Sequence, residues 1–176
     1  MSPDLRYPIG PFEEQAEIRH EDISRYIREI ERLPAAMRQA VAGLSEAQLE
    51  TQYRAGGWTL RQVAHHVPDS HLNSYVRMRL ALTEDEPTIR PYFEDRWATL
   101  ADASRAPVGL SLDLLEALHA RWAFMLREIT PEQWLRTFRH PERGTVTLQG
   151  NLALYAWHGR HHVAQIASAR ERVGLG

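Results

Sequence analysis

Two short segments of the chain concentrate the side chains that could do metal chemistry. Six of the nine histidines lie within residues 65–71 and 158–162, two windows that are far apart in sequence. Imidazole is the commonest metal-binding side chain, and it binds as the neutral ring that is available near pH 7. Two remote clusters therefore predict a fold that brings them together around one metal ion. The chain has no cysteine, so any other ligand must be Asp, Glu or water.

The spacing within the windows narrows the candidate ligands. His158 and His162 stand at positions i and i+4, so on a helix they project from one face and can bind the same ion. A peptidase of the H-E-x-x-H class needs glutamate after the first histidine, where this chain has Gly159, and this argues against that class. On a helix, His65 and His66 would point about 100° apart, a geometry that favours His66 as the third ligand.

A site with three protein ligands is a catalytic arrangement, because one coordination position stays free for water or substrate. Water bound to zinc in such a site can reach a pKa of about 7 and supply a hydroxide. The same position could instead bind a thiol and present a thiolate. We expect one divalent ion per subunit, with Zn²⁺ first and Ni²⁺ or Mn²⁺ as alternatives, since three-histidine sites accept several first-row ions.

Composition limits the partners and the location. The net charge is −2, which gives no basic field for nucleic acid or an anionic membrane surface. All 21 basic residues are Arg, which excludes Schiff-base chemistry on lysine. The N-terminal segment has no signal-like apolar core, and no apolar run reaches membrane-spanning length. We therefore expect a small-molecule substrate, a cytoplasmic protein, and a single domain over residues 1–176.

Helical periodicity predicts an all-α fold, a four-helix bundle with crossover connections. Residues 1–20 should form an extended arm, and four long helices should follow, near residues 21–42, 60–82, 112–129 and 148–172. Capping boxes predict helix starts after Ser45, Thr59 and Thr130, and Ser111 is the expected N-cap of the third long helix. Short extra helices, one of them around residues 93–100, and a small hairpin within residues 137–148 complete the prediction.

Two segments carry a family resemblance. The run GWTLRQVAHH at residues 57–66 resembles the first metal-binding helix of the DinB-like superfamily, and AWHGRHHVAQI at residues 156–166 resembles its last helix. The likeness to the YfiT group of metal-dependent hydrolases also includes residues 6–10 and 71–75. It implies a four-helix bundle that forms a cytoplasmic homodimer, with one divalent ion on His66, His158 and His162.

The resemblance leaves three functions open. The first is a hydrolase that uses metal-bound water. The second is a transferase for a bacillithiol-like low-molecular-weight thiol, as in some relatives of the superfamily. One thiol-dependent branch has glutamate in place of the first histidine of the last-helix pair, whereas this chain has His158. The third function is a non-catalytic metal- or ligand-binding module.

Other polar residues near the windows have both functional and structural interpretations. Asn73, Gln165 and His161 are candidates for binding or catalysis, although surface or bundle hydrogen bonding is the favoured interpretation of the first two. His65, His71 and His161 are expected to be supports or bystanders, with His71 pointing away from His66. An exposed Asp69 and solvated Arg77 and Arg160 are expected. His119 should be a satisfied core histidine, and the core should also hold Trp58, Trp122, Trp134 and Trp157.

Overall fold

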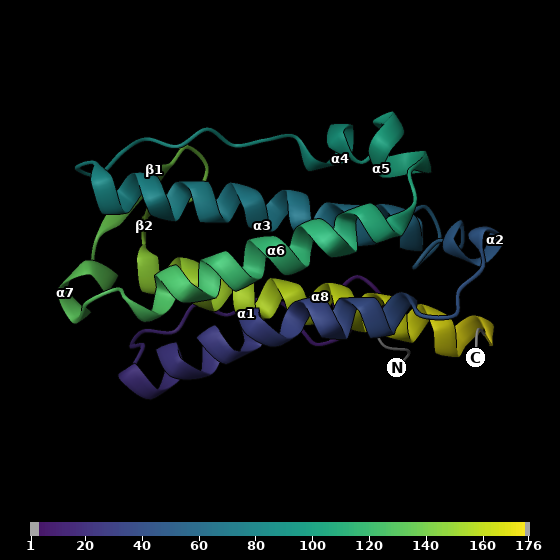
Figure 1. Cartoon of the computed structure of the whole chain (residues 1–176), viewed down its shortest axis with the longest axis horizontal. Helices are drawn as coiled ribbons and strands as arrows, with labels where there is room; N and C mark the ends of the chain where they lie inside the picture. Colours follow the sequence, from purple (N-terminus) through teal and green to yellow (C-terminus); the bar gives the residue numbers. More distant parts are fainter. Residues whose placement is uncertain (1–3, 175–176) are drawn as a thin grey trace.

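Four long helices lie side by side and build the body of the molecule (Figure 1). They are α1 (His20–Val41), α3 (Leu60–Thr83), α6 (Val108–Arg127) and α8 (Leu148–Val173). In the computed structural model, which describes residues 4–174, α1 packs mainly on α6 and α8, and α3 packs on the same two helices. Helices α1 and α3 therefore occupy opposite corners, and the chain crosses the bundle between them. This confirms the predicted four-helix bundle with crossover connections.

The short elements also follow the predicted order. They are α2 (Glu46–Leu49), α4 (Glu94–Trp97), α5 (Ala101–Arg105), α7 (Pro131–Trp134), β1 (Thr137–His140) and β2 (Gly144–Thr147). The two strands form the expected antiparallel hairpin, with Phe138 opposite Val146. Helix α4 lies in the segment 93–100 where a short helix was predicted, α5 follows it, and both contact α3. None of the helices within residues 4–174 has both the length and the apolar character that a membrane span requires.

Capping boxes set the starts of α2, α3 and α7. The hydroxyls of Ser45, Thr59 and Thr130 each accept from the backbone three residues on, and a glutamine at that position bonds back to the cap, as predicted. The prediction for Ser111 is wrong, because α6 begins at Val108, directly after Pro107. Proline fits a helix start but not a helix interior, so it sets the boundary here. The Ser111 hydroxyl instead contacts His65 Nδ1 at 2.7 Å.

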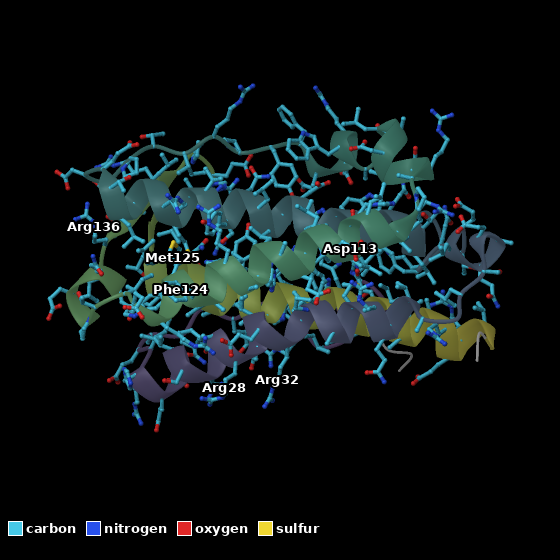
Figure 2. The ribbon with its side chains drawn as sticks, in the orientation of Figure 1. Arg28, Arg32, Asp113, Phe124, Met125 and Arg136 are labelled. Atoms are coloured by element: carbon cyan, nitrogen blue, oxygen red, sulfur yellow. The ribbon has the colours of Figure 1, made fainter. Side chains whose placement is uncertain are left out.

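The apolar core is divided into two clusters along the bundle. One contains Ile30, Met78, Trp122 and Leu152, and the other contains Met37, Val67, Leu115 and Ile166. Between these positions, the helices contribute a layer of inward-facing polar rings, made of His71, His119, His158 and His162. Side chains from all four long helices fill the interior, while Arg28 and Arg32 project outward from α1 (Figure 2). The histidine layer is thus enclosed by apolar packing on both sides.

The N-terminal arm lies along α8. Residues 4–19 contain turns but no helix. The Gly10 carbonyl accepts a hydrogen bond from Trp157 Nε1 at 3.3 Å, and the Arg6 carbonyl accepts one from Gln165 Nε2 at 3.1 Å. These contacts bring the arm to the part of α8 that carries the second histidine window.

Candidate metal centre

Helices α3 and α8 bring the Nε2 atoms of His66, His158 and His162 together. The Nε2 atom of His158 lies 3.2 Å from that of His66 and 3.1 Å from that of His162. One ligand atom from each ring lies within 4.8 Å of the other two. Tetrahedral zinc with Zn–N bonds of 2.0–2.1 Å would place two such nitrogens roughly 3.3 Å apart. The separations along both contacts of His158 therefore fit a metal ion.

The protonation state of the rings also fits a cation. Burial lowers the pKa of His66 to about 4, and it lowers the pKa values of His158 and His162 well below the usual value. At neutral pH the three rings are therefore uncharged and have lone pairs available. One shared hydrogen can link two imidazole nitrogens, but His158 Nε2 faces two others. A divalent cation would satisfy all three lone pairs at once.

Gln165 orients one of these rings. Its Nε2 donates to the Arg6 carbonyl at 3.1 Å, which makes Oε1 the atom that faces His162 Nδ1 at 2.9 Å. An amide oxygen can only accept, so His162 carries its hydrogen on Nδ1 and keeps its Nε2 lone pair. The same amide nitrogen donates to His161 Nε2 at 3.0 Å. Gln165 therefore joins the metal centre to the N-terminal arm through hydrogen bonds.

The other candidates occupy different positions. Asn73 Nδ2 donates to the Asp69 carbonyl at 2.9 Å, and Asn73 does not line the pocket beside the three histidines. His65 contacts Ser111 Oγ and the Ala106 carbonyl, and these contacts link α3 to the start of α6. His161 stacks on Trp157, with ring centroids 4.6 Å apart. Of these three residues, only His161 lies against the metal centre.

Helical geometry directs His71 away from His66, but its ring contacts the candidate ligand His158 on another helix. Its Nε2 lies 3.2 Å from His158 Nδ1, and its Nδ1 lies 3.0 Å from His119 Nε2. His119 is a satisfied core histidine, as predicted, because its Nδ1 also contacts the Ile30 carbonyl. Sequence reasoning missed the connection of His71 and His119 to the candidate ligand, since the two rings meet only through the packing of α3 against α6.

Two expectations about solvated polar residues are wrong. Asp69 is half-buried rather than exposed, and this burial raises its pKa to about 6. Arg77 is also buried, because the connection after α3 folds back over it and the Arg90 carbonyl accepts from its Nη2. Arg160 is exposed and pairs with Glu29. The connection between α3 and α4 covers more of α3 than its polar sequence indicates.

A pocket of about 610 Å³ opens beside the three histidines. The N-terminal arm, the segment before α3, helix α4 and helix α8 form its walls. Trp58 and Trp157 line it, although both were predicted to be core residues, whereas Trp122 and Trp134 are buried as expected. Charged side chains of both signs also line it, namely Arg6, Arg54, Glu94 and Asp95. The candidate centre is thus accessible to a small molecule.

The chain is similar in sequence to a known family. Residues 29–166 match the family model of the DinB superfamily. Over 170 residues the chain is 52% identical to a protein of Bacillus mycoides named "Putative metal-dependent hydrolase", covering 97% of this chain and 98% of the relative. A Bacillus cereus protein of the same name is 53% identical over the same length and coverage.

Solved structures show the same architecture. The structure of YfiT from Bacillus subtilis, described as "a probable metal-dependent hydrolase with an unusual four-helix bundle topology", matches with a TM-score of 0.94 and 46% identity. That match covers 97% of this chain and 98% of the other. The four-helix bundle protein TT2238 matches with a TM-score of 0.56 at 20% identity over 88% of this chain and 99% of the other, and supports the fold alone.

Proposed function

The chain belongs to the DinB superfamily, and from this premise we propose that it is a metal-dependent hydrolase acting on a small molecule. We assign His66, His158 and His162 as the ligands of one divalent ion, with Zn²⁺ first and Ni²⁺ or Mn²⁺ as alternatives. The observation that carries the proposal is the convergence of three uncharged Nε2 atoms beside an open pocket. The names of the relatives support the reaction class.

The ion and the residues around the pocket would contribute to the reaction in different ways. A divalent ion on three neutral imidazoles would supply Lewis acidity and lower the pKa of water toward neutrality. Gln165 holds His162 in the tautomer that a ligand needs. Trp58 and Trp157 provide apolar surface for the organic part of a substrate, and Arg6 and Arg54 offer positive charge to an anionic part.

His161 is the polar group that we assign to substrate contact. It lines the pocket, and its Nε2 accepts from Gln165. Within residues 4–174, its Nδ1 has no hydrogen-bond partner. A buried N–H group without a partner is costly, and a substrate oxygen would satisfy it. Asn73 lies outside the pocket lining, so we assign it no role in the reaction.

The proposal for assembly and location rests on the family resemblance. We propose a homodimer in the cytoplasm, with one metal centre in each subunit. Light scattering coupled to size-exclusion chromatography measures the mass of the assembly directly. A mass of one 20.3 kDa chain at micromolar concentration would contradict the dimer and leave the metal centre unaffected.

One experiment tests the reaction class. Protein purified without an affinity tag is analysed for metals, stripped with a chelator and reloaded with Zn²⁺, Ni²⁺ or Mn²⁺. Each form is screened against esters and amides with and without a small thiol. Turnover by the loaded protein without thiol supports the hydrolase. Loss of both thiol and monochlorobimane, only in the loaded protein, would replace it with a thiol transferase. Stoichiometric metal without turnover would indicate a binding module.

Matched histidine variants test the ligands. His158→Ala removes the ring that contacts both partner nitrogens, so we expect the purified variant to lose most of its metal. His140→Ala removes a histidine on the hairpin, away from the site, and should retain a full equivalent. If His66, His158 and His162 variants all keep one equivalent of metal, the assignment is wrong.

A further inference from the structure

A line of three hydrogen-bonded histidines runs across the bundle from the candidate metal centre. His158 Nδ1 lies 3.2 Å from His71 Nε2, and His71 Nδ1 lies 3.0 Å from His119 Nε2. His119 Nδ1 contacts the Ile30 carbonyl oxygen at 2.5 Å. His71 is 0% exposed and His119 is 1% exposed. The four residues come from α8, α3, α6 and α1, so one line of hydrogen bonds joins all four long helices.

Pro34 explains why the line can end at Ile30. In an α-helix the carbonyl of residue i accepts from the N–H of residue i+4. The residue four positions after Ile30 is Pro34, which lies inside α1 and has no N–H. The Ile30 carbonyl therefore lacks its usual helical donor. His119 supplies the missing hydrogen from the neighbouring helix.

The Ile30 carbonyl determines the direction of every hydrogen bond in the line. An oxygen of this kind can only accept, so His119 Nδ1 carries a hydrogen and, in a neutral ring, its Nε2 is an acceptor. His71 Nδ1 must then donate, which leaves His71 Nε2 as an acceptor. His158 Nδ1 must donate to it in turn. The remaining nitrogen, His158 Nε2, keeps a lone pair directed at His66 and His162.

Burial disfavours a charged imidazole, in agreement with the one-donor, one-acceptor pattern that the contacts give His71 and His119. It lowers the pKa of His119 to about 4 and the pKa values of His71 and His158 well below the usual value. The neighbouring rings of this layer add to the effect for His71 and His158, because each would repel a second positive charge. A single tautomer of each ring then satisfies every nitrogen in the line except His158 Nε2, which faces His66 and His162.

We propose that His71 and His119 are positioning residues, which fix His158 in the tautomer and ring orientation that present Nε2 to a metal ion. The Ile30 carbonyl, which lacks a helical donor because of Pro34, is the fixed end of this line of hydrogen bonds. The inference rests on the proposed metal site, but the line of bonds is a separate property of the fold. Partners of this kind commonly change metal affinity by about 10- to 100-fold when they are removed.

Zinc affinity of matched variants tests the role of His71. His71→Phe keeps a ring of similar shape and removes both hydrogen bonds, so we expect 10- to 100-fold weaker zinc binding in a competition assay with a chelating dye. His71→Gln places an acceptor near the Nε2 position and should recover most of the affinity. His65→Phe removes another buried histidine of α3, bonded only to Ser111 and Ala106, and should leave zinc affinity unchanged.

Ring tautomers provide a readout that a purely structural role would not move. Long-range ¹H–¹⁵N spectra of the zinc-loaded wild type should show Nδ1–H tautomers, with slowly exchanging protons, for His71, His119 and His158. Pro34→Ala adds a competing N–H for the Ile30 carbonyl, and should weaken the His119 Nδ1 bond and speed exchange of its proton. These spectra also test the tautomers, and therefore the positioning role, if His71→Phe fails to fold.

The outcomes distinguish a failure of the positioning role from a failure of the ligand assignment. An Nε2–H tautomer at His71 or His119, or wild-type zinc affinity in His71→Phe, would overturn it. If the wild type binds no stoichiometric zinc, the ligand assignment fails, and the assignment of a positioning role fails with it. In that case spectra of the metal-free protein would still show whether the hydrogen-bond line exists.

Discussion

Gly159 follows the first histidine of the last-helix pair, and we predict that replacing it destabilises the bundle. A Cβ atom at this position would lie 2.9 Å from Leu33 Cδ1 and 3.2 Å from Cγ, and closer still to Cδ2. Leu33 is a buried residue of α1, so its side chain cannot retreat into solvent. Carbon atoms in contact prefer separations of about 3.5–4.0 Å. Gly159→Ala must therefore displace Leu33 or separate α1 from α8.

The magnitude follows from two opposing effects. Overpacking of this kind costs about 1–3 kcal/mol, while alanine favours a helix over glycine by about 1 kcal/mol. Gly109→Ala in α6 is the matched control, because a Cβ atom there meets nothing within 4 Å. The control retains only the helix-forming gain. We expect Gly159→Ala to be less stable than Gly109→Ala by about 1–3 kcal/mol.

Urea unfolding of the metal-free proteins measures this difference without a contribution from metal binding. A second comparison tests the cause. Because Leu33→Ala removes the colliding side chain, it should cost less in the Gly159→Ala background than in the wild type, by about the energy of the clash. Equal stability of the two glycine variants, or additive effects of the Leu33 and Gly159 substitutions, would refute the close approach of α1 and α8.

Two further predictions concern the buried histidines and the residue that orients His162. Burial lowers the pKa values of His66 and His119 to about 4, so between this value and the unfolded value of about 6.5 the unfolded chain binds more protons than the folded one. The metal-free protein should therefore lose stability as the pH falls through this window, by up to about 1.4 kcal/mol per pH unit for each ring, and urea midpoints that stay constant from pH 7.5 to 5 would contradict this. Gln165→Ala removes the acceptor of His162 Nδ1 and should weaken zinc binding about 10- to 100-fold, whereas Gln165→Glu keeps an acceptor and should bind more tightly than Gln165→Ala; equal chelator-competition curves for the two variants would count against the orienting role.

Local signals in the sequence predicted the parts of the fold that depend on neighbouring residues. The capping boxes at Thr59 and Thr130 need only the next three residues, and both form as expected. The i, i+4 spacing of His158 and His162 likewise places both rings on one face of α8. The choice of His66 over His65 used the same helical geometry, and the structure brings His66 to the pair.

The features that were missed depend on contacts between distant segments. Trp58 and Trp157 have the large apolar side chains typical of a core. However, Trp58 Nε1 donates to Asp95 and Trp157 Nε1 donates to Gly10, and these hydrogen bonds hold both rings at the pocket. Helical geometry along α3 relates His71 only to His66, from which it points away. Its actual partner, His158, approaches from another helix. Helical periodicity cannot supply this information, since it describes one helix at a time.

A linked row of histidines solves a problem that separate buried rings would not. Each neutral imidazole buried alone needs one acceptor for its N–H and one partner for its lone pair, and an unsatisfied group costs about 1–3 kcal/mol. In the row from His119 to His158, each ring satisfies the next, so only the two ends need outside partners. Pro34 leaves the Ile30 carbonyl available at one end. The lone pair at the other end belongs to His158 Nε2, which the Nε2 atoms of His66 and His162 approach, and a divalent cation would satisfy all three nitrogens at once.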